Sequence, residues 1–178
     1  MPEKSKIVEH GSNYNWISEC ENLASRIRKR VLSHAVIHGG YLSQACSSAE
    51  VFAYLYEKGL KLGPSNGPII PPPFSGTPST KNPEHRSGME YNGLRHPEND
   101  RFFLSPTHYA MTLYSVLIET NRLGKNGLEQ FNTDGSTIEM IGGEHSPGHE
   151  TNGGSFGQTI SQAAGVAWAR RSKGDSGI

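Results

Sequence analysis

The sequence has little cysteine, no excess of one charge and no long apolar run. Its two cysteines, Cys20 and Cys46, form no C-x-x-C pair and are too few for a zinc set, so we expect buried free thiols in a reducing compartment. Seventeen basic and seventeen acidic side chains cancel, which argues against nucleic acid or an anionic membrane as a partner. The charged N-terminus is not followed by the apolar segment of a signal peptide, and no stretch approaches a membrane span. These absences predict a soluble cytoplasmic protein.

Apolar residues are also scarce for the length of the chain. Only 34% of the 178 residues are hydrophobic, whereas glycine contributes 21 residues and proline 11. A chain of this length forms one domain in most cases. The composition therefore predicts either a loop-rich domain or one that completes its core with another polypeptide.

Two helices are expected in the first third of the chain. Residues 1–13 are polar and predicted to be mobile, and Ser12 or Asn13 would cap a long helix that Gly39-Gly40 ends. The apolar positions that define this helix recur every three or four residues: Ile17, Cys20, Ala24, Ile27, Val31 and Ala35. A second helix is predicted to begin with Ser47 or Ser48 as its cap.

Residues 63–99 interrupt this pattern. The segment contains eight prolines and five glycines and shows no apolar periodicity. Loops of this length are functional, disordered or draped across a partner when they occur in a compact domain. We interpret it as an insertion, with a linker favoured over a proline-rich binding motif because Pro71–Pro73 lacks flanking arginines.

A glycine-rich loop followed by a helix dominates the C-terminal part, from Gly142 to Lys173. Glycine permits positive φ and close approach of the backbone to a ligand, and the first turn of a helix offers unpaired N–H groups. From composition alone, the stretch fits a surface turn as well as a ligand site. Its sequence from Gly153 to Gln158, G-G-S-F-G-Q, resembles the T-G-S-L-G-Q-G stretch of the transketolase family, whose members use thiamine diphosphate.

The segment from Asp100 to Leu117 supports the same resemblance. It is similar to the family pattern D-R-[FL]-[VI]-L-S-[KN]-G-H-[GA], which ends in a helix. The residues themselves predict a short strand at Arg101–Leu104, a cap at Ser105, and Pro106 in the first helical position. His108 would then project from the first helical turn at the carboxyl end of a strand, where open α/β sheets bind ligands.

A third match lies earlier, between Gly39 and Tyr56. The loop and the helix after it resemble the family's G-G-H or S-G-H loop followed by S-x-x-E-[IL]-L-x-x-L-Y. Tyr41 stands where the family has a histidine, and His38 lies three residues before it. A tyrosine can donate a hydrogen bond but does not carry protons near neutral pH. This departure concerns the substrate end of the site.

The resemblance implies an α/β fold. The chain would form part of the family's thiamine-diphosphate-binding fold, namely a partial diphosphate-binding domain over 14–178, helix-rich with few parallel strands. The resemblance also implies roles for single residues. His108 and His145 would be catalytic, and the cofactor would contact His108, Gly154 and Phe156. The substrate channel would be lined by Tyr41 and by His145 or His149, with His145 favoured because it lies nearer the position of the family's G-H-P histidine.

The implied activity is transfer of a two-carbon ketol unit from a ketose phosphate to an aldose, with thiamine diphosphate and Mg²⁺. The family's G-D-G motif and later asparagine, which hold the metal, are expected beyond Ile178, and we assign no metal ligand within the chain. The pyrimidine-binding domain would come from a separate C-terminal transketolase subunit, in a homo-oligomer of such subunits, and this chain alone would be inactive. The alternatives are a component of another thiamine enzyme and a non-catalytic interaction module that retains the fold.

Overall fold

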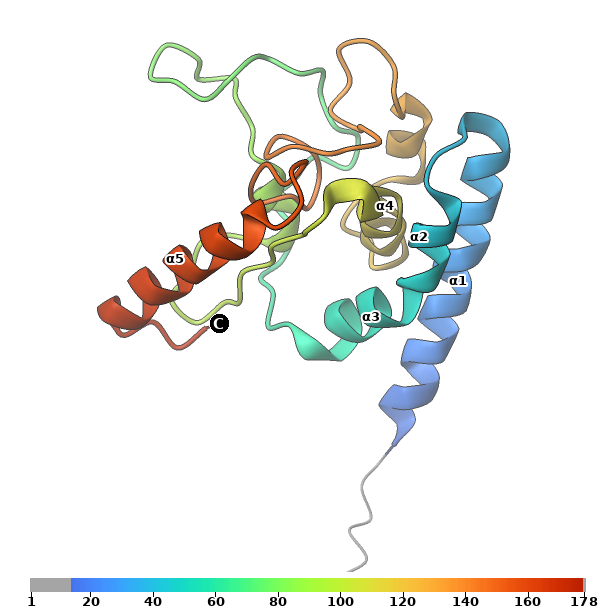
Figure 1. Ribbon diagram of the computed structural model, residues 1–178, viewed down its shortest axis with the longest axis horizontal. Coiled ribbons are helices and arrows are strands. Elements are labelled where there is room, and N and C mark those ends of the chain that lie inside the picture. The colour runs from blue at the N-terminus through green and yellow to red at the C-terminus, as the bar shows by residue number, and fades with distance from the viewer. Residues whose placement is uncertain (1–13, 178) are drawn as a thin grey trace, which may run out of the picture.

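Helices and loops make up residues 14–177, the part of the chain that the computed structural model describes (Figure 1). The α-helices are α1 Asn15–His38, α2 Leu42–Ser47, α3 Ala49–Tyr54, α4 Ala110–Glu119 and α5 Gln158–Lys173. One π-helical turn and three 3₁₀ helices join them: η1 Leu55–Gly59, η2 Gly88–Asn92, η3 Thr107–Tyr109 and η4 Lys125–Gln130. The helix-rich character is as predicted, whereas residues 14–177 contain no strand of the expected α/β sheet.

The long first helix forms where its periodicity predicts it. α1 buries one stripe of its surface and ends at Gly39, whose φ of 73° takes the chain out of the helix. The amide of Gly39 donates to the carbonyl of Ala35 at 2.9 Å. The predicted caps Ser12 and Asn13, like the predicted mobile N-terminus, lie outside the described residues.

The second predicted helix begins directly after Ser48, as α3, and the residues before it form the short helix α2. The hydroxyl of Ser48 donates backwards to the carbonyls of Gln44 and Ala45, at 3.0 and 3.1 Å, and lies 3.0 Å from the hydroxyl of Thr112. The side chain therefore does not cap α3, although Ser48 occupies the position before its first residue. This hydroxyl contact joins the α2–α3 corner to α4.

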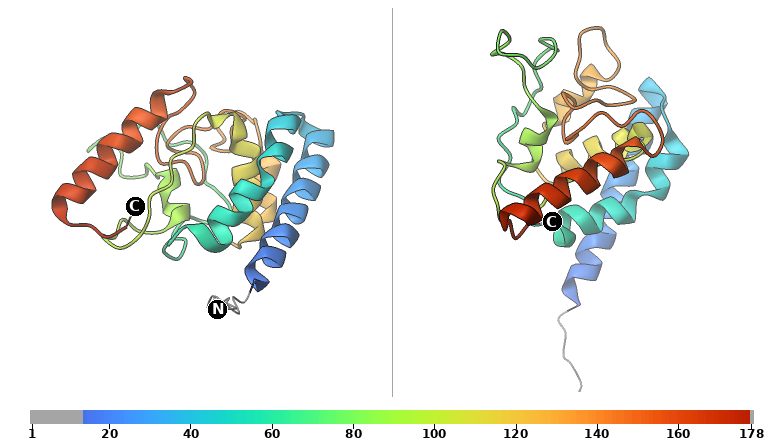
Figure 2. Two further views of the ribbon diagram at one scale, coloured as in Figure 1. Left: turned by 60° about the horizontal axis from the view of Figure 1, so that its bottom comes forward. Right: turned by 60° about the vertical axis from the view of Figure 1, so that its left-hand side comes forward.

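α4 occupies the centre of the molecule, between α1 and α2 on one side and the long loops on the other (Figures 1 and 2). It is buried on all sides, since its first nine residues, Ala110 to Ile118, are all buried. A helix with this pattern is stable only when other elements surround it. The rest of the core comes mainly from the inner stripe of α1 and from α3: Leu23, Ala24, Ile27, Val31, Phe52 and Ala53.

The strand predicted at Arg101–Leu104 is wrong. The segment has no ladder partner within residues 14–177. A strand needs a neighbour to accept its amides, and here the amide of Phe102 donates to the carboxylate of Glu150 at 2.9 Å. Phe102 and Leu104 are buried by packing on α3 and η1 instead, as in the ring contact of Phe102 with Phe52, whose centroids lie 5.9 Å apart.

The predicted start of the helix after this segment also needs correction. Pro106 precedes η3, with an extended ψ of 156°, rather than occupying the first helical position. No side chain caps η3, so Ser105 does not act as a cap. The chain passes from η3 directly into α4, which places His108 one turn before the buried helix.

Residues 63–99 pack against the core and do not behave as a free linker. Tyr91 is 4% exposed, and the side-chain amide of Asn92 donates to the carbonyl of Gly148 at 3.0 Å. At Gly88 a Cβ atom would lie 1.8 Å from the carbonyl oxygen of Ser146, so only glycine fits this crossing. The proline-rich segment therefore supports the glycine-rich loop that precedes α5.

α5 lies on the opposite side of the molecule from α1 (Figures 1 and 2). Only Thr159 and Arg170 are buried among its residues, and Ile160 and Trp168 are 71% and 76% exposed. The guanidinium of Arg170 donates to three backbone carbonyls, those of residues 96, 97 and 99. α5 is thus attached near its ends rather than along its apolar face.

The remaining expectations concern membranes and thiols. Within residues 14–177, no helix is long and apolar enough to cross a membrane. Cys20 and Cys46 are free, as predicted, but both are partly exposed rather than buried.

Candidate functional site

The glycine-rich loop delivers a helix start with no capping side chain. Gly157, with φ of 81°, precedes α5, which begins at Gln158 where the sequence places the change from loop to helix. No side chain caps this start. Unpaired amides and the positive end of the helix dipole favour an anion at such a position. The loop therefore meets one requirement of a diphosphate site.

Three of the predicted site residues gather beside this helix start. The ring of His108 lies 5.1 Å from the ring of Tyr41 and stacks on Phe156 at 5.0 Å with an interplanar angle of 22°. They come from the α1–α2 loop, η3 and the glycine-rich loop, so the three segments that carry the family resemblance converge here. Phe156 is 77% exposed, which leaves its outer face open to a ligand.

Unpartnered polar atoms lie in the same segments as the three rings of Tyr41, His108 and Phe156, which form the aromatic column. The hydroxyls of Thr107 and Thr159 and the Nδ1 atom of His108 are buried without a hydrogen-bond partner. Gly153 packs closely on both threonines. A Cβ atom added to Gly153 would lie 2.4 Å from the Thr159 hydroxyl and 3.1 Å from a methyl carbon of Thr107. Buried polar groups without partners are costly, and a polar ligand would satisfy them. The donor set suits the oxygens of a diphosphate.

A buried ion pair holds the two halves of this site together. The carboxylate of Glu150 accepts from the guanidinium of Arg101 and from the amide of Phe102, and its side chain is 1% exposed. Arg101 precedes η3 and Glu150 precedes the Gly153-Gly154 turn. The pair therefore fixes the position of His108 relative to the glycine-rich loop.

His149 and His145 have different surroundings. His149 is 1% exposed, its Nδ1 lies 3.3 Å from the carbonyl oxygen of Pro147, and burial lowers its pKa to about 4. It is a neutral core side chain that packs on Tyr114, with ring centroids 5.9 Å apart. The interpretation of His149 as a channel-lining residue does not agree with this burial.

His145 is partly exposed and lies against the proline-rich segment. Its ring is 4.5 Å from the ring of Phe74, and its Nε2 lies 3.2 Å from a carboxylate oxygen of Glu139. Within residues 14–177, no hydrogen bond or ring contact joins His145 to His108. Gly154 is exposed beside Ile141, whose methyl carbon would lie 3.7 Å from an added Cβ. The backbone at Gly154 is therefore accessible.

Sequence reasoning did not select Thr107, Thr159 or Glu150. The two threonines carry no motif signal, because a single hydroxyl in a helix start is common. Glu150 had one available signal, since it is one of two acidic residues in the loop, with Glu144, and a single arginine stands in the other matched motif. No three His, Cys, Asp or Glu side chains gather as a metal site within the described residues.

The fold places the aromatic column beside an uncapped helix start, an arrangement that suits an anionic ligand with a ring. Residues 87–176, half of the chain, match the family model described as transketolase, thiamine diphosphate binding domain. The chain therefore belongs to the transketolase family. The matched range starts within the proline-rich segment and includes His108, the glycine-rich loop and α5.

Two curated relatives agree with this assignment. The chain is 33% identical over 153 residues to the uncharacterized transketolase family protein y4mO of Sinorhizobium fredii, covering 85% of this chain and 45% of the relative. It is 27% identical over 146 residues to transketolase-like protein 2 of Homo sapiens, covering 82% of this chain and 19% of that protein. The chain thus spans less than half the length of the curated relatives that it matches.

Proposed function

We propose that this protein binds the diphosphate end of thiamine diphosphate for a transketolase-type transfer of a two-carbon unit from a ketose phosphate to an aldose. The single observation that carries the proposal is the convergence of Tyr41, His108 and Phe156 over buried, unpartnered hydroxyls at the start of α5. Thr107 and Thr159 would donate to phosphate oxygens. Phe156 and the exposed backbone at Gly154 would contact the cofactor ring.

Bound thiamine diphosphate would supply the carbon nucleophile that allows a bond next to a carbonyl to break. The residues of this chain would bind, orient and move protons. His108 would donate to an oxygen that gains negative charge, because its Nδ1 has no protein partner. Tyr41, beside it, would orient a substrate hydroxyl by hydrogen bonding, and His145 would do the same from the side of the proline-rich segment.

The proposal includes partners. Mg²⁺ would accompany the diphosphate, with oxygen ligands from outside the residues described. A C-terminal transketolase subunit with the pyrimidine-binding domain would complete the site, within a homo-oligomer. The assembly would act in the cytoplasm, where Cys20 and Cys46 stay reduced.

The first test is cofactor binding. The complete natural protein is titrated with thiamine diphosphate and Mg²⁺ by calorimetry, alone and with its partner subunit, and ketol transfer from a ketose phosphate is then measured. His108→Ala should lower turnover by about 100-fold to 10,000-fold, the range for a lost acid–base group. His96→Ala, at an exposed histidine of the proline-rich segment, is the matched control and should leave turnover unchanged. Absence of cofactor binding under all these conditions would refute the proposal.

A non-catalytic module is the second candidate. Tyr41 favours it, because a tyrosine stands where the family has a proton-carrying histidine. In that case the protein binds the cofactor or the partner subunit but supports no turnover with any donor. Tyr41→His separates the two candidates, since a gain of turnover would identify an enzyme with an altered substrate end.

A further inference from the structure

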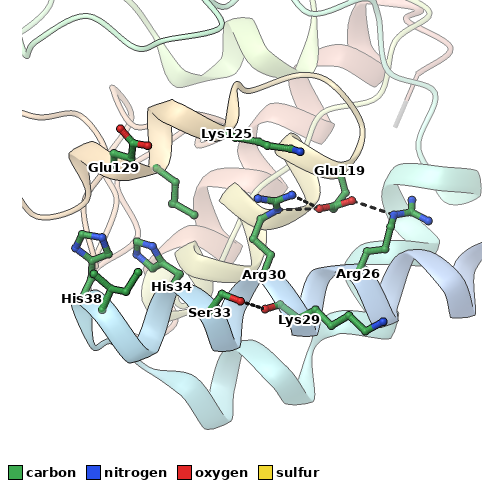
Figure 3. A pocket seen from close by; sticks show the side chains of 11 residues that line it. Arg26, Lys29, Arg30, Ser33, His34, His38, Glu119, Lys125 and Glu129 are labelled. Atoms are coloured by element: carbon green, nitrogen blue, oxygen red, sulfur yellow. Dashed lines mark hydrogen bonds and ion pairs between the residues drawn. The ribbon is translucent and has the colours of Figure 1, made fainter.

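A second cavity lies away from the aromatic column, between the C-terminal half of α1 and the segment formed by the end of α4 and η4 (Figure 3). Its volume is about 430 Å³, and it shares no lining residue with the column. Sites for small organic molecules begin at about 300 Å³. The cavity is therefore large enough for a metabolite.

One end of the cavity holds a fixed arginine. Glu119 accepts from Arg26 at 2.9 Å through one carboxylate oxygen and from Nε of Arg30 at 2.8 Å through the other (Figure 3). Both oxygens of Glu119 are thus occupied. The Nη1 group of Arg30 makes no hydrogen bond with any described residue, and the side chain is 22% exposed. The ion pairs hold the guanidinium in place and leave part of it free for a ligand.

The charge of the cavity is positive. Four cations line it, Arg26, Lys29, Arg30 and Lys125, against the two carboxylates of Glu119 and Glu129. Neither lysine forms an ion pair with any described residue. Lys125, from η4, lines the same cavity as Arg30, so cations from two elements face it (Figure 3). With neutral histidines the net charge is +2, which matches a dianion.

The other end is aromatic and apolar. The ring of His34 stacks on His38 at 4.5 Å and meets Phe131 edge-on at 4.5 Å. Burial, and to a smaller extent the charge of His38, lowers the pKa of His34 to about 4, so this ring is neutral at pH 7. Ile37 and Leu128 complete the surface. This end would accept the carbon body of a ligand.

We propose that this cavity binds a small organic phosphate monoester. Arg30 and Lys125 hold the dianionic phosphate, and the organic body lies over Leu128 and the His34–His38 stack. A tetrahedral dianion fits two cations that approach from different elements better than a monocarboxylate does. Binding joins η4 to α1, and it does not depend on the cofactor site.

Calorimetric titration of the complete natural protein tests this site with ribose 5-phosphate, inorganic phosphate and ribose as probes. Ribose 5-phosphate should bind and ribose should not. Lys125→Glu should lower the affinity for ribose 5-phosphate by roughly tenfold or more. Lys81→Glu makes the same charge change at an exposed lysine of the proline-rich segment and should leave the affinity unchanged. Glu129→Gln removes the cavity carboxylate that forms no ion pair with a described residue, and it should raise the affinity for the ester by about twofold.

The His108→Ala variant separates this cavity from the proposed catalytic site. If the ester binds here, its affinity is the same in His108→Ala, even if the protein proves not to be a transketolase. Three results would overturn the proposal: no binding up to about 10 mM ester, equal affinity in Lys125→Glu, or equal affinity for the ester and inorganic phosphate. The last would identify a simple anion site.

Discussion

α4 and α5 are both rich in small and apolar residues, yet α4 is buried and α5 is largely exposed. α4 is surrounded by α1, α2 and α3, and its residues from Ala110 to Ile118 are all buried. α5 exposes Ile160 and Trp168 and is held near its ends by Thr159 and Arg170. α4 thus carries the stability of the fold. α5 has an uncapped helix start, and its C-terminal end is attached by the hydrogen bonds of Arg170 rather than by a packed face.

Removing the ion pair between Glu150, in the loop before α5, and Arg101, in the segment before α4, should have the largest effect on the free energy of unfolding. Glu150→Ala leaves the largely buried guanidinium of Arg101 and the amide of Phe102 without their acceptor. Breaking a buried pair in this way costs roughly 3–5 kcal/mol. Urea unfolding measures it, with Glu98→Ala, at a largely exposed carboxylate, as the control. An effect below about 1 kcal/mol would show that the two sides are held together by other contacts.

Truncation of an apolar side chain in the core helix α4 has the next largest expected effect. Ile118→Ala removes a side chain that is 5% exposed in α4 and should lower the free energy of unfolding by roughly 2–5 kcal/mol, because the core cannot fully close the space. Urea or thermal unfolding measures this. A loss of less than about 1 kcal/mol would mean that α4 is not the centre of the core.

The stability of the packing around α4 should also depend on pH, through His149. His149 packs on Tyr114 of α4 and has a pKa of about 4 when folded, against about 6.5 when unfolded. Between these values the unfolded chain binds the proton and the folded chain does not. Stability is therefore complete above about pH 6.5 and falls as the pH is lowered towards 4.

This histidine should account for about 2 kcal/mol of lost stability between about pH 7 and pH 5. His149→Asn cannot take up a proton in this range, so its unfolding free energy should fall by about 2 kcal/mol less over the same interval. Urea unfolding at the two pH values measures the difference. An unchanged pH slope in the variant would mean that His149 is accessible to solvent, and would restore it as a channel residue.

The regular helices were predictable because their cause is local. Three-four periodicity specifies α1, and Gly39 ends it. The fate of Arg101–Leu104 was not predictable, because an apolar run becomes a strand only if another strand accepts its amides, and here Glu150 does so from 48 residues away. The packing of residues 63–99 could not be predicted from the sequence either. It rests on single distant contacts, such as that of Gly88 with Ser146.

The candidate site was predictable where a motif fixes the neighbours of a residue. Tyr41, His108 and Phe156 were named from three matched stretches, and the fold places the ring of His108 5.1 Å from that of Tyr41 and 5.0 Å from that of Phe156. His145 was favoured over His149 only by its place near the family's G-H-P histidine, since both stand in one glycine-rich loop and the burial of His149 is seen only in the structure. Thr107 and Thr159 become noticeable only when the structure shows hydroxyls without partners.

The smallest expected effect tests α5 directly. Ile160→Ala makes the same chemical change as Ile118→Ala, but at a side chain that is 71% exposed, so little surface is buried and the free energy of unfolding should change by less than about 0.5 kcal/mol. Alanine also has the higher helix propensity, which offsets part of any loss. Urea unfolding of the complete natural protein measures the change beside Ile118→Ala. If the two variants lose similar stability, the face of α5 that carries Ile160 is covered in solution, and α5 belongs to a packed core as α4 does.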